Sequence, residues 1–212
     1  EVASQIVVDT VGEVYERLRA DREATFPWRL EREKSFAENL LLAALRLSNR
    51  AIVERRTGRL RDMGSTVVAV CLGIHNAVVA HVGDSRIYRL RGSELTALTR
   101  DHSLFEEARA AGLSTMQSKR DCSFANVITR ALGIAERAEP DVCTVETQPG
   151  DLLLLCSDGL SDPLSEPRIA ELLTAARAPG DQALAIATEG LVQAAYDAGG
   201  RDNISAIVVQ VL

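Results

Sequence analysis

The stretch Leu-Leu-Leu-Leu-Cys-Ser-Asp-Gly-Leu-Ser-Asp, residues 152–162, decides the fold of this chain. After the turn at Gly150 and Asp151, the apolar run Leu152–Cys156 predicts a strand that is buried on both faces. The strand ends at Asp158, and a carboxylate at the end of a buried strand is costly unless a positive group lies beside it. The glycine that follows lets the backbone approach a ligand closely. We therefore expect Asp158 to face a divalent cation or an arginine.

The same combination of an apolar strand and a carboxylate beside glycine occurs twice more. The predicted strand residues 79–82 lead into Gly83-Asp84, and residues 199–203, which contain Asp202, precede the predicted strand 204–211. Three strand ends that are far apart in the sequence therefore each offer a carboxylate. This pattern is typical of a metal site.

Four aspartates are candidate metal ligands, because hard cations such as Mg²⁺ and Mn²⁺ prefer several oxygen ligands. They are Asp84, Asp158, Asp162 and Asp202. The loops that would support them contain Gly83, Gly159 and Asn203. The alternative is that each aspartate only caps a turn or a helix, which is the usual role of Asp beside Gly.

Length and composition favour one globular domain, residues 1–212. The apolar fraction is 46 % and the charged fraction is 25 %, both ordinary for a domain with a sizeable core. The net charge of −6 argues against nucleic-acid binding, and no apolar run reaches the length of a membrane span. The four cysteines show no metal-binding spacing, and we interpret them as reduced core residues of a cytoplasmic protein.

The hydrophobic periodicity predicts two N-terminal helices, followed by strands, two further helices and a last strand. The predicted helices are residues 2–19, 31–56, 166–176 and 180–198, the third of them capped by Ser165. The predicted strands are residues 66–72, 77–82, 87–90, 95–98, 142–146, 152–156 and 204–211. Residues 124–133 are expected to return to the core. Short turns join neighbouring strands, so we expect antiparallel sheets covered by helices, an α+β fold, rather than a doubly wound parallel sheet.

Five segments together resemble the metal-dependent protein phosphatases of the type-2C (PPM) family, most closely its bacterial subgroup. In chain order they are Met63-Gly64-Ser65-Thr66, Val82-Gly83-Asp84-Ser85-Arg86, Leu98-Thr99-Arg100-Asp101-His102-Ser103, Cys156-Ser157-Asp158-Gly159-Leu160-Ser161-Asp162 and Gly200-Arg201-Asp202-Asn203. The resemblance spans nearly the whole chain. It implies a four-layer αββα sandwich of two antiparallel sheets flanked by helices.

The resemblance also implies a function, the hydrolysis of phosphoserine and phosphothreonine by a water that two Mg²⁺ or Mn²⁺ ions activate. Asp158 and Asp202 match ligands of the first catalytic metal and are the expected catalytic residues. Asp84, Asp158 and Asp162 match the ligands of a third, weaker metal beside a flap, which residues 103–125 would form. The expected partner is a phosphorylated protein, a protein kinase or its target. His81 is expected to be structural, and His102 is expected to fix a loop.

The chain also departs from the family pattern. The family's opening strands, with the Asp-Gly pair that bridges the two catalytic metals, have no counterpart in this sequence, so we expect an N-terminally incomplete domain. The ligands of the second metal cannot be identified. The alternative function is therefore a non-catalytic, phosphatase-like regulatory or scaffold domain that binds a phosphoprotein without hydrolysing it.

Overall fold

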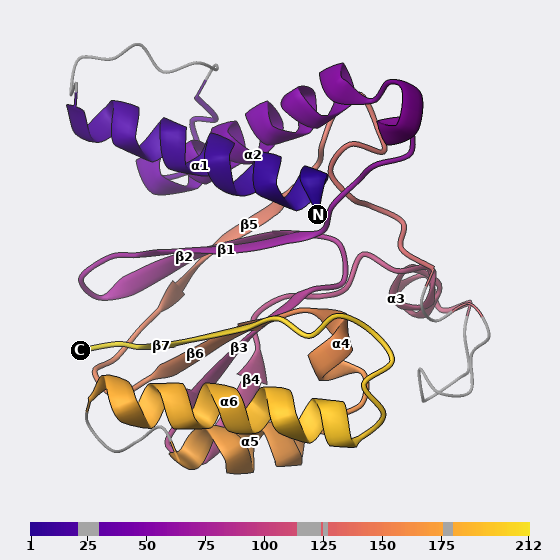
Figure 1. Ribbon diagram of the computed structural model, residues 1–212. Helices are drawn as coiled ribbons and strands as arrows, with labels where there is room; N and C mark the ends of the chain where they lie inside the picture. The colour runs from indigo at the N-terminus through magenta and orange to yellow at the C-terminus, as the bar shows by residue number, and fades with distance from the viewer. Residues whose placement is uncertain (21–29, 114–123, 125–126, 176–179) are drawn as a thin grey trace.

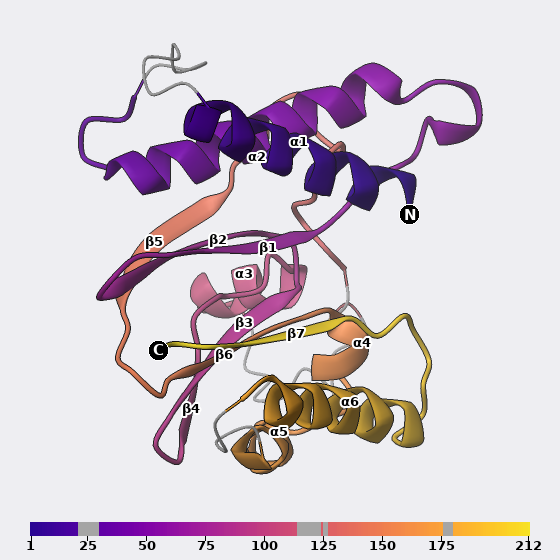
Figure 2. The same ribbon diagram turned by 60° about the vertical axis from the view of Figure 1, so that its left-hand side comes forward.

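The computed structural model describes residues 1–20, 30–113, 124, 127–175 and 180–212. Figure 1 and, from another side, Figure 2 show a stack of helices, sheet, sheet and helices. The helices α1 (Val2–Ala20) and α2 (Phe36–Arg55) cover one sheet, and α5 (Glu166–Thr174) and α6 (Asp181–Asp197) cover the other. The α+β sandwich that the sequence predicted is confirmed.

The first sheet has the strand order β1-β2-β5, and both pairs are antiparallel. Its strands are β1 (Val67–Leu72), β2 (Asn76–Val82) and β5 (Asp141–Glu146). The side chains of Val78, Ala80 and Val82 alternate toward the helices, where they pack with Ile6 and Leu41. Apolar side chains that recur every second residue on β2 thus pack in one core with apolar side chains that recur at helical spacing on α1 and α2.

The second sheet has the order β4-β3-β6-β7 and is also antiparallel throughout. Its strands are β3 (Arg86–Arg91), β4 (Glu94–Ala97), β6 (Leu152–Cys156) and β7 (Ala206–Gln210). Leu152 and Leu154 of β6 pack with Ile169 of α5 and Leu191 of α6. Leu153 alternates to the opposite face and is also fully buried, so β6 is covered on both faces, as predicted.

Several predicted boundaries were wrong for local reasons. Helix α2 begins at Phe36 rather than at residue 31, because Ser35 and Glu38 form a capping box there. Ser165 precedes α5 but makes no capping bond with its side chain. Residues 127–133 form only isolated bridges, and Leu132 is buried whereas Val127 is exposed. Residues 125 and 126, which belong to the predicted core segment 124–133, lie outside the described part of the chain.

The cysteines are thiols where the structure describes them, but only one is a full core residue. Cys156 is buried, Cys71 is half-buried and Cys143 is exposed. Burial raises the pKa of the Cys156 thiol to about 12. The prediction of a core position is therefore wrong for Cys143. Cys122 lies outside the described residues.

In the described part of the chain each sheet has two edge strands, β1 and β5 in the first sheet and β4 and β7 in the second. On β7, Ala206 and Val208 pack toward α5 and α6, so Ile207 alternates to the face between the two sheets. Ile207 is nevertheless 60 % exposed, and Leu72 on the corresponding face of β1 is 46 % exposed. The apolar space between the sheets is therefore incompletely covered at these edges.

Arginines of β3 tie the two sheets together. Arg91 donates to both carboxylate oxygens of the buried Asp151, at 2.8 and 2.7 Å, and to the carbonyl oxygen of Glu146 in β5. Arg89 donates to the same carbonyl oxygen at 3.1 Å. The hydrogen bonds from Arg91 hold the pKa of Asp151 below its ordinary value, and they outweigh burial, which raises it.

This network makes a prediction about acid stability. A carboxyl group whose pKa is lowered by folding stabilises the protein above its unfolded pKa, and that stabilisation is lost as the pH falls toward the folded pKa. Asp151→Asn should therefore lower the thermal midpoint at neutral pH and flatten the loss of stability below roughly pH 4. Thermal melts from pH 3 to pH 7 test this, with the exposed Asp181→Asn as the matched control. Identical pH profiles for Asp151→Asn and the parent chain would contradict it.

Candidate metal centre

The register of the second sheet brings the three carboxylate loops to one end. Arg86, the first residue of β3, pairs with Cys156, the last residue of β6, and Cys156 pairs with Ala206, the first residue of β7. Asp84 lies two residues before this row on β3, and Asp158 lies two residues beyond it on β6. Asp202 precedes β7 by four residues. The three strand ends that the sequence analysis identified therefore lie at the same end of the sheet.

Direct contacts join the loops that carry Asp158 and Asp202. The Ser157 hydroxyl donates to the carbonyl oxygen of Asn203 at 3.1 Å, and Ser205 donates its backbone N–H to that hydroxyl at 3.0 Å. A Cβ atom on Gly159 would collide with the carbonyl oxygen of Asn203. Glycine is therefore required at position 159 by the close approach of the two backbones.

Asp158 and Asp162 lie on a short helix that the sequence did not predict, α4 (Asp158–Ser161) with Asp162 as its C-cap. The backbone N–H of Asp162 donates to the carbonyl oxygen of Asp158 at 2.8 Å. Residues four apart in a helix share one face, so the two carboxylates lie on the same side of α4. Asp158 is half-buried and Asp162 is exposed.

The alternative role of these aspartates, as turn caps, is also visible. One oxygen of Asp158 accepts the N–H of Gly159 at 2.8 Å, and one oxygen of Asp202 accepts the N–H of Asn203 at 2.7 Å. Each bond uses one of two carboxylate oxygens, and an ionised carboxylate can accept several partners. The turn role therefore does not exclude a cation. The ligand role of these aspartates remains a prediction.

Asp84 lies where the chain crosses from the first sheet to the second, between β2 and β3. It is only 5 % exposed. The preceding Gly83 has φ +109°, and a Cβ atom there would collide with the Thr66 side chain. The hydroxyl groups of Thr66 and Ser85 share a hydrogen bond of 3.0 Å. The backbone on both sides of Asp84 is thus held by side-chain and steric contacts.

An ion pair that the sequence analysis missed fixes the start of β3. Arg86 donates to both carboxylate oxygens of Asp101, at 2.7 Å each, and to the Tyr88 hydroxyl at 3.0 Å. These partners raise the pKa of Arg86, with the hydrogen bond to Asp101 as the largest cause. The Arg86 guanidinium thus binds Asp101 and Tyr88 together and is held at the start of β3, beside the end of β6.

Among the described residues, the four predicted aspartates do not form a group whose ligand atoms all lie within 4.8 Å of one another, but three other residues do. The ligand atoms of His81, His102 and Asp141 lie within 4.8 Å of one another. Their hydrogen bonds argue against a metal there. The Gly83 N–H donates to Nδ1 of His102 at 3.2 Å, and the Arg130 guanidinium lies 3.1 Å from Asp141. One imidazole nitrogen of His102 is occupied, and a positive charge already accompanies the carboxylate.

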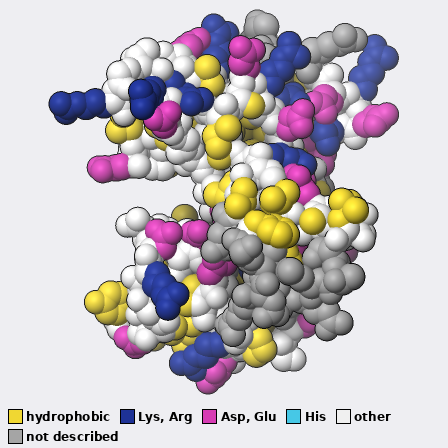
Figure 3. Space-filling model, turned by 90° about the vertical axis from the view of Figure 1, so that its right-hand side faces the viewer, with side chains coloured by type: hydrophobic (Ala, Val, Ile, Leu, Met, Phe, Trp, Pro, Cys, Tyr) yellow, Lys and Arg dark blue, Asp and Glu magenta, His cyan; other side chains and the backbone are white. Residues whose placement is uncertain are grey.

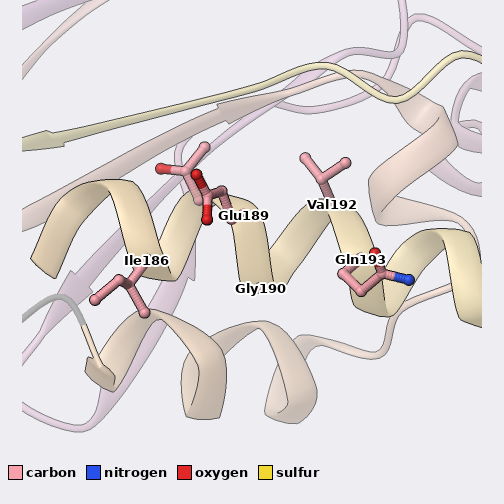
Figure 4. A pocket seen from close by; sticks show the side chains of 6 residues that line it. Ile186, Glu189, Gly190, Val192 and Gln193 are labelled. Atoms are coloured by element: carbon pink, nitrogen blue, oxygen red, sulfur yellow. The ribbon is translucent and has the colours of Figure 1, made fainter. Parts of the chain in front are cut away.

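The molecular surface has a hollow and a separate groove. Figure 3 views the molecule from the side of α3 (Leu104–Ala110) and shows acidic side chains beside a hollow between the upper and lower halves. A separate open groove runs along α6 and is lined by Ile186, Thr188, Glu189, Gly190, Val192 and Gln193 (Figure 4). This groove contains one carboxylate and no basic group, and none of the predicted ligands lines it. Among the described residues, no helix has both the length and the apolarity needed to cross a membrane.

Comparison with known proteins identifies the family. A family model described as "Protein phosphatase 2C" matches residues 1–194. The chain belongs to the protein phosphatase 2C family, which confirms the resemblance that the five sequence motifs indicated.

Individual relatives are bacterial serine/threonine phosphatases. The protein phosphatase PhpP of Streptococcus pneumoniae is 40 % identical over 149 residues, which are 70 % of this chain and 58 % of PhpP. The crystal structure of the Mycobacterium tuberculosis phosphatase PstP superimposes with a TM-score of 0.81 at 30 % identity, and covers 100 % of this chain and 82 % of that one. A structure of the PstP catalytic domain in complex with two manganese ions has a TM-score of 0.76 at 32 % identity. The superposition covers 98 % of this chain and 80 % of that one. This chain spans about 58 % of the length of PhpP and of the serine/threonine phosphatase stp of Listeria monocytogenes.

The geometry predicts how two of the candidate ligands respond to substitution. Asp158→Asn and Asp202→Asn should each weaken Mn²⁺ binding by roughly tenfold or more, because carboxylate charge is the main attraction for a hard cation. Without metal, both variants should be at least as stable as the parent, because like charges in one site repel. Isothermal calorimetry and thermal melts measure the two effects.

The matched control for these variants is Asp197→Asn, since Asp197 is exposed at the end of α6 and only bonds Gln193. A lower thermal midpoint in both site variants, together with unchanged Mn²⁺ affinity, would show that the aspartates are caps and not ligands.

Proposed function

We propose that this chain is the greater part of a metal-dependent serine/threonine protein phosphatase domain that removes phosphate from phosphoserine and phosphothreonine. The observation that carries the proposal is the convergence of the Asp84, Asp158 and Asp202 loops at the end of β6. The names of the relatives, all protein phosphatases of bacteria, support the same reaction.

The donor set fits Mg²⁺ or Mn²⁺, since it consists of carboxylate oxygens on neighbouring loops. Asp158 and Asp202 would hold the first catalytic metal, and Asp84 with Asp158 and Asp162 would hold a third, weaker one. Bound metal ions would lower the pKa of a water and neutralise the phosphoryl oxygens of the substrate. The PstP structure with two manganese ions supports this choice of metal. The chain's own part is to hold the carboxylates in place, which Gly83, Gly159 and Asn203 make possible.

The substrate that we propose is a phosphorylated protein, either a protein kinase or the target of one. A cytoplasmic location belongs to the same proposal. It is supported by the described cysteines, which are thiols and not disulfides.

We further propose that residues 1–212 are a single domain that lacks its first strands, and that residues 103–125 form its flap. The exposed apolar side chains at the edges of β1 and β7 support the proposal that strands are missing, because added strands would cover Leu72 and Ile207. Of the flap, the structure describes residues 103–113 and 124, with Ser103 capping α3 through a bond to Glu106. Residues 114–123 lie outside the described part.

A non-catalytic regulatory domain is the second candidate function. It is favoured by the incomplete ligand set, since the residues that we identify supply half of the first metal's ligands and none of the second metal's. Such a domain would keep the fold and bind a phosphoprotein without hydrolysing it.

Activity and its metal dependence separate the two candidates. In a protein that joins this chain to its missing strands, hydrolysis of a small aryl phosphate should require millimolar Mg²⁺ or Mn²⁺ and should stop on addition of EDTA. Turnover should return when excess Mn²⁺ is added back. Activity that persists undiminished in EDTA would contradict the metal mechanism. A complete absence of turnover with metal bound would favour the regulatory domain.

The incomplete domain makes its own prediction. Residues 1–212 alone should self-associate through the open edges of β1 and β7, and should turn over substrate at least tenfold more slowly than the completed domain. Sedimentation velocity and phosphatase assays on both proteins test this. Ile207→Lys, which places a charge on the uncovered face, should reduce the association. A monomeric chain 1–212 with two tightly bound metals and full turnover would refute the account of the missing strands.

A further inference from the structure

We propose that His102 is a positioning residue for the Asp84 loop: it binds both backbone polar groups of Gly83 and so sets the direction of the neighbouring carboxylate. The inference rests on the proposed function, because it concerns the metal that Asp84 would help to hold. It does not rest on any metal at the histidine itself.

The contact between His102 and Gly83 is reciprocal. The backbone N–H of His102 donates to the carbonyl oxygen of Gly83 at 2.9 Å. The N–H of Gly83 donates to Nδ1 of the His102 ring at 3.2 Å. One residue thus satisfies both the donor and the acceptor of a buried glycine. Because Gly83 immediately precedes Asp84, any rotation of its peptide groups moves Asp84.

The ring of His102 is itself held on its other side. Since Nδ1 accepts a hydrogen bond, the neutral ring carries its proton on Nε2, which lies 3.3 Å from Oδ2 of Asp141. Arg130 in turn donates to Oδ1 of Asp141 at 3.1 Å, and its guanidinium lies 3.4 Å from Nε2, farther than the Asp141 oxygen. The ring also stacks on His81, with centroids 4.5 Å apart and planes inclined by 28°. His102 is only 4 % exposed.

These contacts favour the neutral ring that the geometry requires. Burial is the largest cause that lowers the pKa of His102, followed by the neighbouring His81, and both outweigh the opposing effect of Asp141. Asp141 is the first residue of β5 in the first sheet, whereas Asp84 leads into β3 of the second. His102 therefore connects the Asp84 loop to the far strand of the opposite sheet.

The contacts to Gly83 have a consequence for metal binding. A carboxylate ligand contributes most when its direction is fixed before the cation arrives, and the loss of a group that orients a ligand typically weakens metal affinity by about 10–100-fold. Asp84 has its loop fixed on one side by Thr66 and Ser85 and on the other by His102. Removal of the Nδ1 acceptor should therefore weaken binding that depends on Asp84, without any change in the ligands.

Two substitutions separate the two ends of the ring. In His102→Asn the side-chain oxygen can take the place of Nδ1 and keep the acceptor for Gly83, but it cannot reach Asp141. In His102→Gln the amide reaches toward the Nε2 position, and the acceptor for Gly83 is lost. The exposed His75→Gln is the matched control, and Asp84→Asn defines the binding that is due to Asp84.

The experiment measures Mn²⁺ affinity of chain 1–212 by calorimetry and the exchange rate of the Gly83 amide by NMR. We expect His102→Gln to weaken the Asp84-dependent binding by roughly tenfold or more and to speed exchange at Gly83 by a similar factor. His102→Asn should stay within about threefold of the parent in both measurements, although it loses the bond to Asp141.

Other results would overturn the proposal. Equal losses in both variants, matched by equal drops in thermal midpoint, would assign His102 an ordinary packing role. Unchanged exchange at Gly83 in His102→Gln would contradict the positioning role whatever the metal does. Absence of Asp84-dependent Mn²⁺ binding in the parent chain would count against the proposed third metal, and the exchange rates would still decide whether His102 holds Gly83.

Discussion

The pairing of β6 with β3 on one side and β7 on the other is the constraint on which the candidate site depends. Because all three strands are held in one register, the ends that carry Asp84, Asp158 and Asp202 cannot move independently. The apolar residues of β6 enforce that register, since a slip by one residue would exchange Leu153 and Leu154 between two different cores. The hydrophobic packing of the strand therefore fixes the positions of carboxylates that contribute nothing to the core.

The carboxylates oppose this packing. Several aspartates gathered at one end of a sheet repel one another, and Asp84 is also buried. The fold tolerates them because the surrounding backbone is held from several directions. Arg86 is locked to Asp101, Gly159 lies against Asn203, and His102 binds Gly83. The divalent cation that we propose would offset the repulsion between these carboxylates.

The sequence could predict the helices and strands that have a strong hydrophobic periodicity, and the loops that interrupt them. The run Leu152–Cys156 identified the central strand, and the change of polarity at Asp158 identified the candidate site. Local polar features were harder to predict from the sequence. A capping box or a four-residue helix such as α4 involves only a few residues and hardly alters the hydrophobic pattern. Pairing across long sequence distances was not visible at all. Asp101 binds Arg86 and Asp141 meets His102, and both partners lie many residues away along the chain.

The most direct test of the central claim is a titration of chain 1–212 with substoichiometric Mn²⁺, followed by the paramagnetic broadening of backbone amide signals in NMR spectra. A cation held by the converging loops should broaden the amides of Asp84, Gly159 and Asn203 together, at the lowest concentrations. The amides of Cys143 and Val145, in β5 of the other sheet, should stay sharp over the same range. Broadening that begins around Asp141, or that affects the three loops at different concentrations, would contradict the account.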